Sequence, residues 1–250
     1  MMIELGLYGV VMVIAMTMAG IIGFAANVIA LPLLSMFLPL NLVVSMLVLI
    51  AALQSGVQAF RVRDRIHWKE LAHIVLYLVI GMPFGLIMLN YLPELALKAI
   101  LSVFIAATAV KGLVETSRGK KRDTFQERPW HKLLLVCSGF ISGAFGCGGP
   151  LTVIYTRNRY RDKDMFRVMQ FGCGTFSMGL STLGHVASGS YTIASLPYVV
   201  IGLVAVAIAL RVSTWLVKRM NTTFFQQLVN VVLLFSALSL MSQVAQGVLA

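Results

Sequence analysis

The chain has 250 residues, of which 59% are hydrophobic and only 12% are charged, and its mean hydropathy is +0.89. Soluble domains are roughly half apolar and about one quarter charged, so they could not bury this much apolar surface. The composition therefore excludes most soluble enzymes and predicts an all-α polytopic membrane protein. The net charge of +11 is expected from cytoplasmic loops beside anionic lipid. We expect no nucleic-acid partner, because no nucleic-acid-binding motif accompanies the charge.

Eight long apolar segments follow one another along the chain. A membrane-spanning helix needs about 20 apolar residues, and the segments lack the alternation of transmembrane β-strands. They lie at about 5–38, 40–60, 70–90, 94–114, 132–155, 165–187, 193–217 and 224–247.

The basic residues constrain how these segments cross the membrane. Nearly all of them fall in four clusters, at 61–69, 111–132, 157–167 and 211–219. If segment 132–155 crossed the bilayer, one strongly basic loop would lie outside, against the positive-inside rule. The conflict disappears if this segment enters and leaves on the same side. Glycines permit such a tight reversal, and proline is tolerated in the first turn of a helix. We therefore predict two half-helices that meet near 143–150; the alternative is an ordinary span with one basic loop outside.

The first segment repeats this pattern. A single helix over 5–38 would be about 50 Å long, whereas the apolar core of a bilayer is about 30 Å thick. The residues Ala19–Gly23 align with Ser142–Gly146, and Tyr77–Gly81 resembles Tyr198–Gly202. The sequence thus predicts two inverted repeats, each with one broken helical hairpin and three transmembrane helices. Their predicted bounds are 1–116 and 132–250, joined by a basic cytoplasmic linker at 117–131, with both termini outside.

The predicted breaks supply a candidate binding site. A half-helix that begins inside the membrane directs unpaired N–H groups and the positive end of its dipole into a cavity, and it can bind an anion without a basic side chain. Amide and hydroxyl groups in the spans add hydrogen bonds. The alternative is that the glycines and amides serve only helix packing. The candidate substrate-binding residues are Gly23, Asn27, Gln54, Gly146, Gly148, Gly149, Pro150, Gln170 and Thr175.

Two further residues have two interpretations each. Arg167 either guides anions or contacts lipid headgroups, and His185 either contacts substrate or only other helices. No Asp or Glu lies deep in a span, which disfavours a proton or cation pump. Hydrolase and P-loop motifs are absent, so we expect no enzyme activity, no catalytic residue, no metal site and no cofactor.

The stretch from Gly139 to Pro150, with the half-length repeat and the turn Arg61–Ile66, resembles the signature of the sulfite exporter TauE/SafE family. The first repeat departs from it, because Gly23–Asn27 lacks the glycine run. The resemblance implies a transporter of the bacterial inner membrane. Members of this family are associated with sulfite, sulfonates such as sulfoacetate, and other organosulfur or carboxylate anions.

The expected function is export of a small sulfur oxyanion by alternating access. The inside-negative membrane potential drives anions outward, so an exporter needs no coupling ion. The alternatives are an anion channel and a cation-coupled importer of a sulfonate or carboxylate. The expected partners are the small anion and membrane lipid, and the sequence leaves open whether the chain forms a homodimer.

Overall fold

The computed structural model describes residues 2–24, 26–93, 129–160, 162–192 and 195–219, with isolated positions at 96–107 and 231–242. Within these residues every regular element is helical, which confirms the predicted class. The predicted segments 94–114 and 224–247 lie mostly outside the described residues. The elements are α1 (Met2–Ile22), α2 (Ala26–Leu34), α3 (Leu40–Arg61), the 3₁₀ turn η1 (Arg63–Arg65), α4 (Trp68–Tyr91), α6 (Pro129–Phe145), α7 (Gly149–Arg159), α8 (Lys163–Ala187) and α9 (Leu196–Arg219).

The outer helices present apolar side chains to their surroundings. By length and composition, α1, α3, α4 and α9 each contain a stretch able to cross a membrane. On the outward faces, Ile14 of α1 is 52% exposed, Phe84 of α4 is 64% exposed and Val204 of α9 is 56% exposed. Apolar surface of this extent marks contact with lipid or protein in place of water. The protein is therefore a membrane-integral helical bundle.

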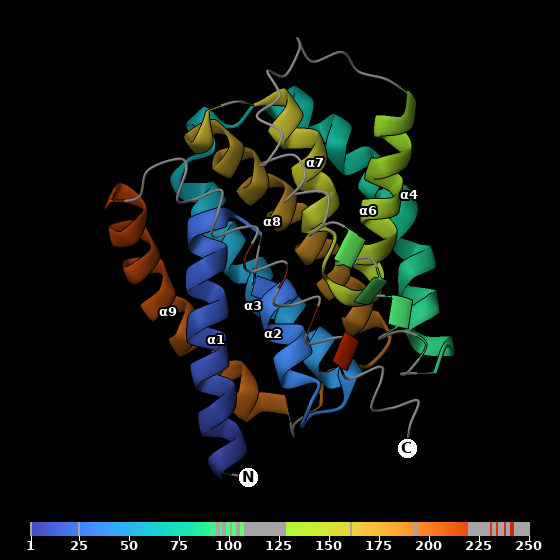
Figure 1. Cartoon of the computed structure of the whole chain (residues 1–250), viewed down its shortest axis with the longest axis vertical. Helices are drawn as coiled ribbons and strands as arrows, with labels where there is room; N and C mark the ends of the chain where they lie inside the picture. The colour runs from blue at the N-terminus through green and yellow to red at the C-terminus, as the bar shows by residue number, and fades with distance from the viewer. Residues whose placement is uncertain are drawn as a thin grey trace.

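The bundle contains two broken hairpins. Figure 1 shows α1 and α2 as one hairpin and α6 and α7 as the other. The breaks lie at Gly23 (φ +101°) and Gly146 (φ +64°), in the left-handed region that glycine adopts at little cost. The second hairpin is closed by Ser138, whose Oγ donates to the Gly148 carbonyl over 2.7 Å. Segment 132–155 thus turns back on itself, as its glycines and flanking charges predict.

The two halves break at equivalent positions. The three helix boundaries around the break in the second half each lie 123 residues after their counterparts in the first half. The pairs are the ends of α1 and α6 at Ile22 and Phe145, the starts of α2 and α7 at Ala26 and Gly149, and the starts of α3 and α8 at Leu40 and Lys163. The packing is equivalent too, since α1 packs on α9 as α6 packs on α4, and α3 packs on α8 between them. An inverted repeat would produce this pattern.

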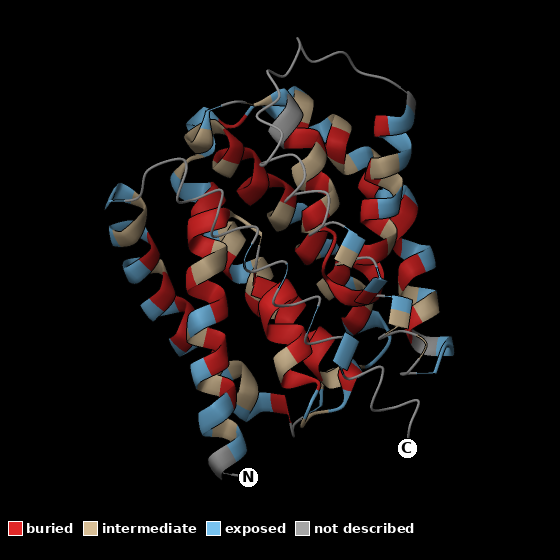
Figure 2. Cartoon of the chain, viewed as in Figure 1, coloured by how far each residue is buried: buried red, intermediate tan, exposed pale blue. Residues whose placement is uncertain are grey.

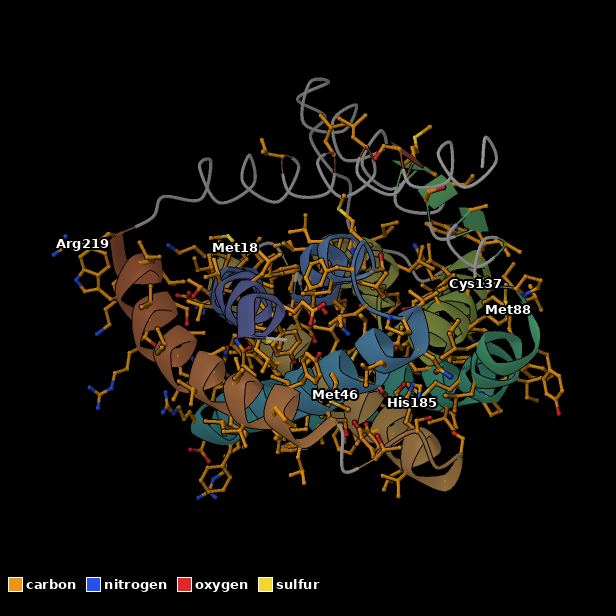
Figure 3. The ribbon with its side chains drawn as sticks, turned by 90° about the horizontal axis from the view of Figure 1, so that it is seen from below. Met18, Met46, Met88, Cys137, His185 and Arg219 are labelled. Carbon is orange, nitrogen blue, oxygen red and sulfur yellow. The ribbon has the colours of Figure 1, made fainter. Side chains whose placement is uncertain are left out.

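Viewed from below, the bundle has α9 and Arg219 at one edge, and α4 and α6, with Met88 and Cys137, at the opposite edge (Figure 3). The burial colouring shows the interior red through α2, α3, α7 and α8 (Figure 2). Helix α2 is buried along nearly all of its length. The breaks themselves lie inside the protein, with Gly23 against Gln170 of α8 and Gly146 against Val48 of α3, as broken backbone in a membrane requires.

Helices α4 and α6 approach each other closely through glycines on both. A Cβ atom at Gly85 would lie 2.0 Å from the Phe140 carbonyl oxygen, and one at Gly139 would lie 2.0 Å from that of Leu78. A Cβ at Gly143 would meet the Met82 carbonyl at 2.3 Å. Small residues spaced four apart allow such contact between membrane helices. Gly143 thus serves helix packing, which is the alternative that the sequence left open for it.

The described basic residues gather at one end of the bundle. Helices α4, α6 and α8 begin at the top of Figure 1, and α3 and α7 end there, whereas α1 begins at the bottom. Three partly exposed tryptophans, Trp68, Trp130 and Trp215, lie near the corresponding ends of α4, α6 and α9. A belt of tryptophan and basic side chains is typical of a membrane–water interface.

Candidate functional site

The starts of α2 and α7 meet in the interior of the bundle. Asn27, in the first turn of α2, donates from Nδ2 to the Gly146 carbonyl over 2.7 Å. A Cβ at Gly149, the first residue of α7, would lie 2.7 Å from the Cβ of Phe24. From this meeting point the two helices run in opposite directions (Figure 1). The positive ends of two helix dipoles therefore face one region.

A cavity of about 50 Å³ lies at this region. Its walls come from both breaks and from α3 and α8. Seven of the nine predicted site residues line it, namely Gly23, Asn27, Gln54, Gly146, Gly148, Gly149 and Gln170. Pro150 and Thr175 do not. Pro150 is buried in the first turn of α7, and the methyl group of Thr175 faces Gly56 of α3 at 4.0 Å from a Cβ built there.

The three amides of the site are buried and also tie the helices together. Asn27, Gln54 and Gln170 are 2%, 3% and 2% exposed. Gln54 Nε2 donates to the Met16 carbonyl of α1 over 2.7 Å, and Gln170 Nε2 donates to Thr156 Oγ1 over 3.3 Å. The oxygens Asn27 Oδ1 and Gln54 Oε1 have no hydrogen-bond partner among the described residues. Each amide therefore links two helices and lines the cavity at once.

Several lining residues were not among the predicted ones. They are the polar residues Ser55, Gln58, Ser138, Ser142, Thr152 and Ser177, together with Gly174. Their helical spacing indicates that they share faces with one another. Ser138 and Ser142 are one turn apart on α6, and Gln170, Gly174 and Ser177 form a stripe on α8. None of the described residues that line the cavity is Asp, Glu, Lys, Arg or His. In the described part of the chain, no group of three or more His, Cys, Asp or Glu residues is placed to hold a metal ion.

The sequence profile of one transporter family, described as sulfite exporter TauE/SafE, matches residues 8–240. The chain belongs to the sulfite exporter TauE/SafE family. A search of curated proteins and a search of solved structures gave no match. Family membership makes the chain a membrane transporter, in keeping with its lipid-facing helices and its interior cavity.

Two glycines of this TauE/SafE protein are required by packing around the site. A Cβ at Gly148 would lie 2.3 Å from the Ser138 carbonyl oxygen, and one at Gly20 would lie 2.3 Å from Ser213 Oγ. A side chain at Gly148 would therefore push α7 away from α6 before it blocked any ligand. A loss of transport on enlarging Gly148 would not by itself locate the anion.

Arg167 and His185 lie apart from the cavity lining. Arg167 is not among the described residues that line the cavity; it donates to the carbonyls of Gly20 and Ile21 at the end of α1, over 2.8 and 2.7 Å. His185 is 2% exposed, and its Nδ1 lies 3.3 Å from Ser190 Oγ in the turn after α8. This contact is with the turn after its own helix, and the buried Nε2 of His185 has no hydrogen-bond partner among the described residues.

Proposed function

We propose that this TauE/SafE protein exports a small sulfur oxyanion, sulfite or a sulfonate such as sulfoacetate, across the bacterial inner membrane by alternating access. The observation that carries the proposal is the pair of opposed helix starts at one cavity, whose described lining residues carry no charge. Backbone N–H groups at such starts bind oxyanions. Uncharged surroundings let the anion leave again, whereas a buried Lys or Arg would hold it tightly.

The size of the cavity favours the smallest members of this substrate class. One water needs roughly 10–15 Å³ of such volume, so a cavity of about 50 Å³ holds a few non-hydrogen atoms. Sulfite has four such atoms and methanesulfonate has five. Sulfoacetate is larger and requires the hairpins to move apart. We therefore expect sulfite to bind best in the described conformation.

The equivalent halves provide a route for alternating access. In the proposed inverted repeat, residues 1–116 and 132–250 rock against each other about the cavity, as in other transporters built from such repeats. The end of the bundle that carries the described basic residues is proposed to face the cytoplasm, and both termini to face outward. The proposed cytoplasmic linker, 117–131, lies mostly outside the described residues.

The energetics favour export without a coupling ion. An inside-negative potential drives a monoanion outward by about 2.3 kcal/mol per 100 mV. Among the described residues, the cavity lining includes no carboxylate that would hold a coupling proton or cation. Uptake would oppose the potential, so a cation-coupled importer is the less favoured alternative.

The experiment uses purified protein in proteoliposomes loaded with sulfite, in sodium-free buffer at equal pH on both sides. A potassium–valinomycin gradient sets the potential, and efflux should quicken as the interior becomes negative. Efflux that requires a sodium or proton gradient would contradict the uniport. Saturable counterflow of labelled against unlabelled substrate distinguishes the carrier from an anion channel, which shows none.

A further inference from the structure

Arg167 places a fixed positive charge at the first break. It lies in the second turn of α8 and its side chain is 16% exposed. Its guanidinium donates through Nε to Ile21 O over 2.7 Å and through Nη2 to Gly20 O over 2.8 Å. These carbonyls belong to the last turn of α1, directly before the chain reverses at Gly23.

The last turn of a helix can bind a cation. Its carbonyls have no partner within the helix and they carry the negative end of the dipole. In transporters built from broken helices, such half-helix ends coordinate sodium or protons next to the substrate. At the first break of this protein, the carbonyls are already occupied by a guanidinium that is covalently part of α8.

The surroundings hold this guanidinium in place and leave the break positively charged. Its Cζ lies 5.3 Å from the centre of the Phe171 ring, a distance typical of cation–π contact. Asp164 approaches Nη1 only at 4.0 Å and is 47% exposed, so water screens that pair. The second break is closed differently, since the Gly146 carbonyl accepts from the neutral amide of Asn27.

The end of α1 adjoins the cavity. Ala19 and Gly23, on either side of the two bonded carbonyls, both line it. Without a cation, the negative end of α1 would face the bound anion and oppose the two helix starts. The guanidinium cancels this repulsion without entering the cavity.

We infer that Arg167 is a tethered counter-cation, which occupies the position of a coupling ion and makes anion binding independent of sodium. This inference rests on the proposed function for its effect on transport. Arg167 is a positioning residue, because it acts through the carbonyls of α1 and does not touch the anion. Its removal should create a vacant site for a free monovalent cation.

The test compares the wild type with Arg167→Ala in choline, sodium and guanidinium chloride at millimolar concentrations. Hydrogen bonds to a charged group contribute about 1.5–3 kcal/mol each, so sulfite efflux by the variant in choline should fall roughly ten- to a hundredfold. Guanidinium or sodium should restore most of the loss, and the same cations should raise the melting temperature of the variant. The control is Arg63→Ala, at a position that is 58% exposed at the basic end. Neither sodium nor guanidinium should change the efflux or the melting temperature of this control or of the wild type.

Two more variants keep the test decisive if Arg167→Ala does not fold. Arg167→Lys retains the charge and should stay indifferent to the added cation, whereas Arg167→Gln retains a donor without charge and should become cation-dependent. Equal responses of these two variants, or a loss in Arg167→Ala that no cation restores, would overturn the inference. The melting measurements need no transported substrate. They therefore still test whether a free cation replaces the Arg167 guanidinium if the wild type does not carry sulfite.

Discussion

Asn27 offers the most direct test of anion binding at the paired helix starts. The substitution Asn27→Asp keeps the size of the side chain, replaces the donor Nδ2 with an oxygen and adds a negative charge. Asn27 lines the cavity and is only 2% exposed, so water screens this charge weakly. The variant therefore places a resident anion where the substrate is proposed to bind.

The expected effect on anion binding is large, and a smaller loss of stability accompanies it. In a cavity this small, the two negative charges would lie about 5 Å apart; at an effective dielectric constant of about 20 their repulsion is about 3 kcal/mol. This weakens anion binding roughly a hundredfold. A carboxylate cannot donate to the Gly146 carbonyl, and leaving this buried acceptor without its donor costs about 1–3 kcal/mol of stability. An acidic residue at a helix start returns about 0.3–1 kcal/mol.

The assay measures the dissociation constant of sulfite or methanesulfonate by calorimetry on purified protein, with efflux from proteoliposomes alongside. Asn41→Asp is the matched control, because it makes the same chemical change at an exposed position in the first turn of α3. We expect the control to bind like the wild type. If Asn27→Asp binds the anion within about threefold of the wild type while its melting temperature is preserved, the anion does not bind between the helix starts.

Three further predictions follow from the geometry. Gly174→Leu should fill the cavity and abolish transport while the protein still inserts, because a Cβ there meets only the Ser55 side chain at 3.3 Å; the control Gly179→Leu, on the same helix with open space around it, should transport normally. Gly85→Ala should lower the melting temperature by several degrees, since a Cβ 2.0 Å from the Phe140 carbonyl forces α4 and α6 apart at about 1–3 kcal/mol; an unchanged melting temperature would contradict the close packing. Gln126→Cys and Lys163→Cys, in a background without the native cysteines, should both resist a membrane-impermeant thiol reagent in intact cells, and labelling of either position would disprove the shared cytoplasmic side.

The breaks of the chain were predictable because they follow from two simple constraints. Segment 5–38 is too long for the bilayer, and segment 132–155 is flanked by basic clusters that favour the same side. Glycine is the residue that adopts a positive φ most readily, so Gly23 and Gly146 were the natural reversal points. The structure places the reversals at these two residues.

Part of the cavity lining could also be predicted from the sequence. At about 100° per residue on a helix, Gln170, Gly174 and Ser177 share one face of α8, whereas Thr175 points about 140° away from Gln170. The helical period thus places Gly174 and Ser177, and not Thr175, on the face of α8 that lines the cavity. Ser138 and Thr152 were harder to find, because they line the cavity only when α7 folds back along α6.

The role of Arg167 could not be predicted from the sequence at all. A basic residue near the start of a spanning segment reads as a membrane-interface residue. Its partners on α1 are 146 and 147 positions away, and no local pattern specifies that α1 ends beside α8. Only the packing of the hairpin against α8 turns an interfacial arginine into a helix cap.

The two breaks are equivalent in backbone and different in chemistry. Shifted by 123 residues, Asn27 corresponds to Pro150, so an exact twofold copy would require a proline side chain to donate to the Gly23 carbonyl, which proline cannot do. The first break instead takes its donor from α8, where Arg167 corresponds to the apolar Val44 of α3. A guanidinium thus caps the end of α1 while an amide caps the end of α6. Both helix ends that would repel an anion are covered, and both helix starts that attract one remain directed at the same cavity.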